Sequence, residues 1–135
     1  LKELAGPTVE FLGFVPDNDL PELFARCKAF LFPGLEDFGI VPVQAQAAGR
    51  PVIAFKGGGA LDTMIPGKTG MYFDQQTVES LSEALAAFDA SVYDPGVIRE
   101  HAMQFDTALF KRAMMEYVER AWDEFSAGKS RDKSG

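Results

Sequence analysis

The segment from Gly34 to Gln44 has the residue types best suited to chemistry, because it places glycines and carboxylates where a loop enters a predicted helix. The first N–H groups of a helix have no partner within the helix, and the helix dipole is positive at that end. Gly39 stands at the entry and has no Cβ, so an anion can approach the backbone closely. The pattern therefore predicts a phosphate-binding site at the start of this helix.

Two carboxylates in the same loop narrow the choice of ligand, because Glu36 and Asp37 repel a bare phosphate. A ligand with a diphosphate beside several hydroxyls reconciles them, since amides bind the phosphate and carboxylates accept hydrogen bonds from hydroxyls. A nucleotide-sugar has both parts. Gln44 lies about one turn inside the helix, from where its side chain can rise toward such a ligand. The alternatives are that Glu36 or Asp37 only caps the helix and that Gln44 is an exposed helix residue.

Three consecutive glycines, Gly57 to Gly59, follow a predicted strand and precede a short predicted helix. A dinucleotide-binding G-x-G-x-x-G motif needs a glycine where Asp62 stands, so the alternative of a dehydrogenase domain rests on a partial motif. The glycines either face a ligand or a partner domain, or form only a permissive connection. Lys56 beside them either meets a phosphate or stays solvated.

Composition disfavours several other classes of function. The 135 residues carry 13 basic and 20 acidic side chains, a net charge of −7, which argues against a nucleic-acid partner. A single cysteine cannot form an internal disulfide, which fits a reducing, cytoplasmic compartment, and one cysteine with one histidine cannot complete a zinc site. Cys27 and His101 could form a catalytic pair by number alone. We interpret Cys27 as a buried helix-end residue and His101 as a surface residue.

The elements that must position these residues alternate between strand and helix. Apolar runs predict strands at 9–15, 29–32, 51–55 and 70–73, the second buried on both faces. Spacing and breakers predict helices at 20–26, 40–48, 60–65, 77–88, 94–103 and 107–125. This alternation predicts an α/β domain over 1–125 with a Rossmann-like parallel sheet flanked by helices. The loops after Val15, Phe32 and Phe55 should then share one sheet edge.

Three finer expectations concern caps, core and tail. Asp19 and Glu22 have the spacing of a capping box for the first predicted helix. The large apolar residues at core spacing are Phe30, Phe32, Met114, Met115 and Trp122. The polar segment 126–135 is expected to be a disordered tail.

The run from Glu36 to Ala54 (EDFGIVPVQAQAAGRPVIA) closely resembles the group 1 glycosyltransferases, the retaining family 4 sugar transferases of the GT-B fold. The resemblance extends to Val9–Val15 before this run and to Gly57–Gly70 after it. It implies the C-terminal, donor-binding half of a GT-B fold, truncated at its N-terminus. Leu1–Gly6 looks like the end of a helix that precedes the first matched strand.

The resemblance also implies roles for individual residues. Glu36 matches the family's catalytic glutamate, which contacts the donor sugar near the reaction centre. The family's second glutamate contacts the ribose hydroxyls and is replaced here by Gln44, whose neutral amide has one acceptor oxygen and is a weaker partner. The amides of Phe38–Val41 are implied to hold the diphosphate, and Val15 and Asp17 to lie against the base. The implied substrate-binding residues are Val15, Asp17, Gly34, Asp37, Phe38, Gly39, Ile40, Val41 and Gln44.

The same stretch is similar to mannosyltransferases of surface-polysaccharide pathways. This implies transfer of mannose from GDP-mannose to a glycan or lipid-linked acceptor, with no metal and no other cofactor. An acceptor domain outside this chain is implied as the partner, so we expect the chain alone to be inactive, with membrane contact only through that missing part, at the inner face. The last helix should expose an apolar patch that favours self-association. A non-catalytic pseudo-enzyme or interaction domain is the alternative, and Gln44 is the feature that supports it.

Overall fold

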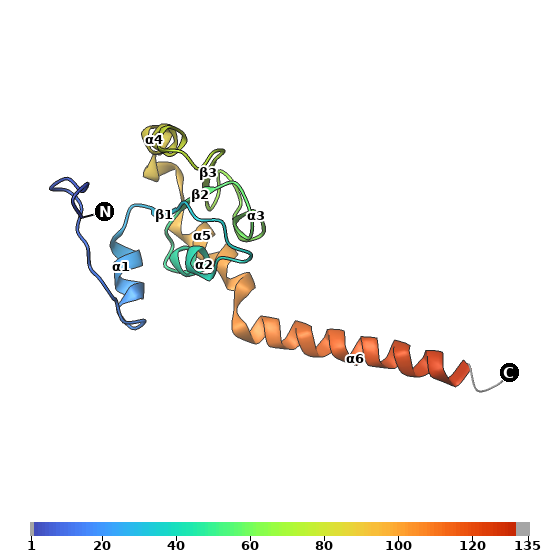
Figure 1. The fold of residues 1–135 in the computed structure, drawn as a ribbon. Helices are drawn as coiled ribbons and strands as arrows, with labels where there is room; N and C mark the ends of the chain where they lie inside the picture. Colours follow the sequence, from blue (N-terminus) through green and yellow to red (C-terminus); the bar gives the residue numbers. More distant parts are fainter. Residues whose placement is uncertain (1, 132–135) are drawn as a thin grey trace.

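The computed structural model describes residues 2–131, with side chains through residue 127. Its helices and strands alternate along the first two thirds of the chain, and helices alone follow (Figure 1). In chain order the elements are α1 (Leu20–Arg26), β1 (Phe30–Phe32), α2 (Ile40–Ala47), β2 (Val52–Phe55), α3 (Ala60–Thr63), β3 (Gly70–Phe73), α4 (Val78–Ala87), the 3₁₀ helix η1 (Ala90–Val92), α5 (Pro95–Ala102), the 3₁₀ helix η2 (Met103–Phe105) and α6 (Thr107–Arg131).

The three strands form a parallel sheet in the order β1-β2-β3, which confirms the predicted α/β class. β2 is the central strand, and its residues Val52 to Ala54 are fully buried, as a continuous apolar run in a parallel sheet requires. β1 lies at the edge of the sheet and is buried on one face only. Leu31 is 41% exposed, so the expectation of burial on both faces of β1 was wrong.

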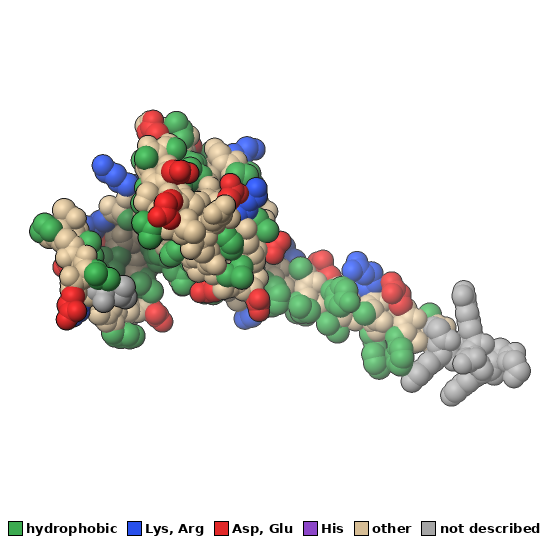
Figure 2. All heavy atoms as spheres, turned by 45° about the horizontal axis from the view of Figure 1, so that its top comes forward, with side chains coloured by type: hydrophobic (Ala, Val, Ile, Leu, Met, Phe, Trp, Pro, Cys, Tyr) green, Lys and Arg blue, Asp and Glu red, His purple; other side chains and the backbone are tan. Residues whose placement is uncertain are grey.

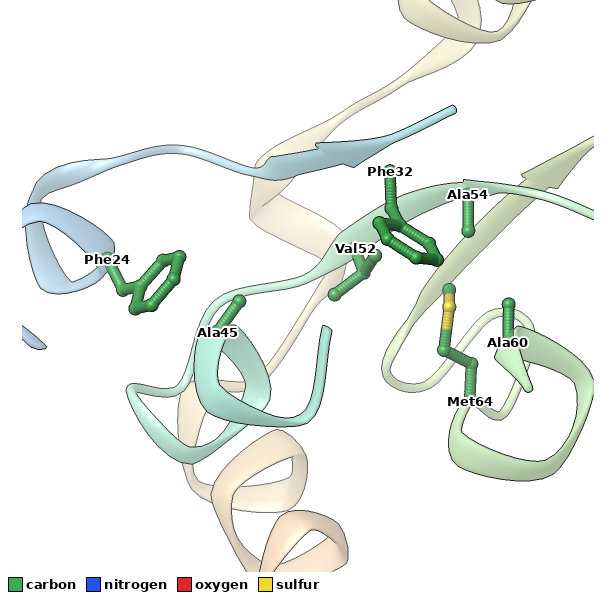
Figure 3. Close-up of a cluster of buried hydrophobic side chains, with 7 residues drawn as sticks. All are labelled: Phe24, Phe32, Ala45, Val52, Ala54, Ala60 and Met64. Atoms are coloured by element: carbon green, nitrogen blue, oxygen red, sulfur yellow. The ribbon is translucent and has the colours of Figure 1, made fainter. Parts of the chain in front are cut away.

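Side chains alternate across β2 and build a separate core on each face of the sheet. Val52 and Ala54 join the cluster between the sheet and α1, α2 and α3, shown in Figure 3 and made up of Phe24, Phe32, Ala45, Val52, Ala54, Ala60 and Met64. Ile53 points to the other face, where it packs with Phe73 and with Ala84 of α4. The two clusters fix β1 and β2 between helices, and the loops at their carboxyl ends are thereby held in place.

Several helix boundaries follow from residues that the sequence makes visible. Thr77 accepts a hydrogen bond from the Ser80 amide at 3.2 Å, and Asp94 accepts one from the Gly96 amide at 2.7 Å. Gly49 ends α2 in a left-handed conformation with φ of 76°. Asp19 precedes α1 but makes no side-chain cap, so the predicted capping box does not form.

The segment 9–15 is not a strand, in contrast to the prediction. A strand needs a hydrogen-bonded neighbour, and no strand of the described residues pairs with this segment. Its apolar side chains are largely exposed, including Phe14 at 90%. The expected helix end before it is also wrong, because residues 2–4 form a turn; Leu1 lies outside the described residues.

The last helix continues to Arg131, so the expected helix end at Phe125 was wrong, and residues 126–131 of the segment expected to be a disordered tail are helical. Residues 132–135 lie outside the described part. α6 projects away from the body, and apolar side chains gather along it (Figure 2). Met114, Met115 and Trp122 are 45%, 64% and 65% exposed and are not core residues. The expected exposed apolar patch is therefore confirmed. Within the described residues, no helix combines the length and the apolar character needed to cross a bilayer.

Candidate functional site

The loop that follows β1 rests on the triglycine loop that follows β2. The Gly59 amide donates a hydrogen bond to the carbonyl of Glu36 at 2.7 Å. A Cβ on Gly58 would lie 2.3 Å from the Glu36 carbonyl oxygen, and one on Gly59 would lie 2.1 Å from that of Phe38. Both positions therefore accept only glycine without a backbone shift. The triglycine is thus more than a permissive connection, and these two loops do meet at the carboxyl ends of β1 and β2.

The N-terminus of α2 presents backbone amides that no side chain caps. Gly39 is its N-cap residue with φ of 73°, and a Cβ there would touch the Phe32 ring at 3.4 Å. Pro42 has no N–H, so the amides left without a helical partner are those of Gly39, Ile40 and Val41. These amides and the helix dipole form the environment that an anionic group needs.

The side chains of Glu36 and Asp37 are exposed beside these amides. Neither of them caps α2, which excludes the alternative that they serve only as capping residues. No salt bridge or side-chain hydrogen bond holds either carboxylate within residues 2–127. Both carboxylates are consequently free to accept hydrogen bonds from the hydroxyls of a ligand.

A pocket of about 260 Å³ lies between α1 and α2 and brings together two predicted site residues that are distant in the sequence. Asp17 comes from the loop before α1, and Gln44 lies on α2, one helical turn beyond its free amides. The remaining lining is mostly apolar and consists of Leu20, Pro21, Phe24, Ala47 and Ala48. The pocket therefore offers a flat apolar group a surface with polar atoms at Asp17 and Gln44.

Other predicted residues lie apart from this pocket. Val15 lines a different hollow along α1, with Leu12 and Phe14. Gly34 is exposed at the start of the β1–α2 loop. Lys56, a candidate phosphate contact, forms an exposed ion pair with Asp74 at 3.6 Å.

A sequence profile of the family described as glycosyl transferases group 1 matches residues 1–91. The chain belongs to the group 1 glycosyltransferases. The matched range includes the 33–39 loop, α2, the triglycine and the Asp17–Gln44 pocket. This family membership confirms the resemblance, and it argues against the dinucleotide-dehydrogenase alternative.

Individual relatives of this group 1 glycosyltransferase chain include two mannosyltransferases. The alpha-1,3/1,6-mannosyltransferase ALG2 of Dictyostelium discoideum is 36% identical over 88 residues, which are 64% of this chain and 20% of the relative. The GDP-mannose-dependent alpha-(1-6)-phosphatidylinositol monomannoside mannosyltransferase of Mycobacterium tuberculosis is 37% identical over 86 residues, 58% of this chain and 22% of the relative. The chain thus spans about a fifth of the length of these relatives.

Solved structures with the same architecture are also glycosyltransferases. Sucrose-phosphate synthase from Thermosynechococcus elongatus superposes with a TM-score of 0.69 at 27% identity, over 88% of this chain and 30% of the other. Anabaena HepE in complex with UDP-glucose superposes with a TM-score of 0.67 at 27% identity, over 82% of this chain and 32% of the other. These likenesses confirm a GT-B glycosyltransferase fold for the group 1 chain.

Sequence reasoning missed a buried polar cluster behind α2. Gln46 is fully buried, and its Nε2 donates to the carbonyl oxygens of Thr63 at 3.0 Å and Pro42 at 3.3 Å. His101 is half-buried rather than a surface residue, because its Nε2 lies 3.1 Å from the same Thr63 oxygen. The polar neighbours of His101 in the sequence gave no signal of this contact, since its partner is a backbone group of α3.

The two residues that could have formed a catalytic pair have other partners. The Cys27 thiol donates to the carbonyl of Phe24 at 3.1 Å, whereas His101 contacts Thr63. Burial raises the pKa of the Cys27 thiol, and the nearby Arg50 guanidinium offsets part of that rise. Within the described part of this group 1 glycosyltransferase, no three His, Cys, Asp or Glu side chains are grouped to hold a metal ion.

Proposed function

We propose that this chain is the donor-binding part of a retaining glycosyltransferase that transfers mannose from GDP-mannose to a glycan or lipid-linked acceptor. The observation that carries the proposal is the pocket shared by Asp17 and Gln44, which lies along α2 from its uncapped amides. A nucleotide-sugar bound along α2 has its nucleoside in the pocket and its diphosphate on the amides of Gly39 to Val41. Its sugar then lies beside Glu36 and Asp37.

The proposed chemistry is electrostatic. When the bond between the sugar and the diphosphate breaks, negative charge grows on the departing phosphate, and fixed amides at a helix N-terminus stabilise that charge. Glu36 acts at the sugar, where its carboxylate accepts hydrogen bonds from hydroxyls. This assignment calls for no metal ion or cofactor. In this proposal the acceptor binds to an acceptor domain outside this chain, and that domain forms the other side of the cleft. The enzyme acts in the cytoplasm, and any contact with a membrane is made by the acceptor domain.

Guanine is the base we propose for the donor. Asp17 presents a carboxylate at the pocket, and guanine carries two adjacent donors, N1–H and N2–H, that a carboxylate accepts together. Uracil carries a single N–H, and this N–H lies between two carbonyl oxygens. A carboxylate that approaches the N–H is repelled by these oxygens, so Asp17 suits guanine better than uracil. Both named relatives are mannosyltransferases, which supports mannose as the sugar, and the Mycobacterium tuberculosis enzyme is named as GDP-mannose-dependent, which supports guanine as the base. The HepE structures, in contrast, are complexes with UDP or UDP-glucose.

An amide-resolved NMR titration with GDP, UDP and NAD in parallel tests the donor. We expect GDP to shift the amides of Gly39 to Val41 and residues around Asp17, and UDP and NAD to bind more weakly. Asp17→Asn replaces one acceptor oxygen by a donor, so it should weaken GDP binding about tenfold. The same change should strengthen UDP binding, because it removes the carboxylate that repels uracil's carbonyl oxygens and supplies a donor to them. Stronger binding of UDP than of GDP by the unaltered chain would overturn the assignment of guanine.

Gln44 separates the donor-binding proposal from the alternative of a non-catalytic domain. Gln44→Glu provides a charged acceptor for ribose hydroxyls, and we expect it to strengthen GDP binding about fivefold. If neither the unaltered chain nor Gln44→Glu binds any nucleotide, the non-catalytic alternative is favoured. The chain alone, incubated with GDP-mannose and candidate acceptors, should show no sugar transfer, because in the proposed arrangement the acceptor binds to another domain.

A further inference from the structure

Phe38 immediately precedes the free amides of α2, and it is supported from two sides. Below it, the backbone of Gly59 lies so close that a Cβ there would be 2.1 Å from the Phe38 carbonyl oxygen. Beside it, the Phe38 ring meets the ring of Phe105 edge-on, with 6.0 Å between centroids and 71° between planes. Phe38 is 49% exposed, and among the described residues the Phe105 ring is the one aromatic ring in contact with it.

Phe105 is in turn held by His101. The two rings are 5.7 Å apart at an interplanar angle of 76°, and His101 Nε2 lies 3.1 Å from the carbonyl oxygen of Thr63. Because that oxygen can only accept, Nε2 carries the proton. Thr63 also accepts from Gln46, which lies on α2 itself. A chain of contacts therefore connects Phe38 to Phe105 on η2, to His101 on α5 and, through the Thr63 carbonyl, to α2. Phe38 itself precedes the N-terminus of α2.

The other end of α2 is tied to α5 as well, because Arg99 Nε donates to the carbonyl of Ala47 at 3.3 Å. Open space of about 620 Å³ adjoins Phe38 and Phe105 on the side of α6. Without the Phe105 ring, Phe38 has room to turn into this space. The amides of Gly39 to Val41 would then lose their fixed direction, on which electrostatic stabilisation of a phosphate depends.

We propose that Phe105, anchored by His101, is a positioning residue that sets the place of Phe38 and of the phosphate-binding amides that follow it. This inference rests on the proposed function of the α2 N-terminus. It assigns a role in donor binding to residues outside the matched range 1–91, on a segment that touches no ligand in the proposed arrangement.

The test compares the unaltered chain with Phe105→Ala and a matched control, Phe88→Ala. Phe88 is likewise a half-buried phenylalanine with a ring partner, Tyr93 at 5.6 Å, but it packs on the opposite face of the sheet. We expect Phe105→Ala to weaken GDP binding about three- to tenfold and Phe88→Ala to leave it unchanged. Phe105→Ala should also speed hydrogen exchange of the Gly59 amide before any nucleotide is added, because the hydrogen bond from this amide to the Glu36 carbonyl joins the loop of Phe38 to the triglycine.

A second pair of variants tests the anchor. His101→Gln keeps a side-chain N–H that can reach Thr63, so it should retain most of the GDP affinity. His101→Leu has no such N–H and should weaken GDP binding as much as Phe105→Ala does. Equal effects of Phe105→Ala and Phe88→Ala on both exchange and binding would overturn the inference. If the unaltered chain binds no GDP, the proposed function fails, and the exchange rates of the ligand-free variants alone decide the inference.

Discussion

Single glycines control how closely the two loops of the site approach each other. Gly59→Ala would place a Cβ against the backbone of Phe38, where no flexible side chain can yield. We expect this substitution to lower the free energy of unfolding by about 3 kcal/mol and to abolish the GDP-induced shifts. Gly34→Ala is the control for stability, because its Cβ meets nothing within 4 Å. Urea unfolding measures the free energy of unfolding of both variants. An equal loss for Gly59→Ala and Gly34→Ala would contradict the prediction.

Gln46 shows how a buried amide constrains its position. Its Oε1 has no hydrogen-bond partner among the described residues, and its Nε2 faces two carbonyl oxygens. Gln46→Met conserves volume and removes the unpaired oxygen, so we expect a loss of less than about 1 kcal/mol. Gln46→Glu directs a carboxylate at those carbonyls and should cost about 3 kcal/mol or more at neutral pH. Denaturant unfolding at pH 7 measures both values, and similar losses would count against this explanation.

Cys27 is expected to be an unreactive thiol. Burial raises its pKa, so less thiolate is present at a given pH than for a free cysteine. Alkylation by iodoacetamide at pH 7 should therefore be slower than for glutathione, and the rate should keep rising at pH values where glutathione has levelled off. A rate at pH 7 equal to or above that of glutathione would show that the thiol is more accessible than the fold indicates.

At the scale of elements, the capping side chains provide a direct comparison. The Asp94 carboxylate accepts from two amides at the start of α5, at 2.7 and 3.2 Å, whereas Asp19 makes no side-chain cap for α1. Asp94→Ala should cost about 1 kcal/mol of unfolding free energy, and Asp19→Ala only a few tenths. Thermal unfolding of the two variants tests this, and an equal loss for Asp19→Ala would refute it.

The sequence predicts elements well where the determining signal is local. The buried run of β2, the left-handed Gly49 after α2 and the caps Thr77 and Asp94 all act within a few residues, and their elements were predicted to within about two residues. The segment 9–15 has a strand-like pattern, but a strand also needs a neighbour, which the sequence does not specify. In α6 the spacing of apolar residues predicts which face of the helix is apolar, but it does not predict whether another surface covers that face.

The positions of the candidate-site residues in the fold were predictable to a similar extent. The loop from Gly34 to Gly39 and the start of α2 lie where the motif places them, and Gln44 and Asp17 share a pocket. The contact of His101 with Thr63 joins segments whose sequences contain no common motif, so no pattern indicated it.

At the scale of the whole molecule, the exposed apolar face of α6 is the surface through which we expect copies of the chain to associate. Its exposed apolar side chains, with Met114, Met115 and Trp122 among them, are removed from water when two copies pack along this helix. We expect concentration-dependent self-association in sedimentation experiments. Met114→Glu should shift the chain toward monomer, whereas Glu116→Gln should change little. Monomer at all concentrations would contradict the prediction.

The place of the chain's only tryptophan has a practical consequence. Trp122 lies on α6, away from the sheet and both cores, and is 65% exposed. Its fluorescence therefore reports what happens to the projecting helix and is nearly silent about the body of the protein. A blue shift of its emission would signal that another surface has covered α6, while unfolding of the sheet and its helices has to be followed by circular dichroism. One chain thus carries two separate optical signals, one for association and one for unfolding.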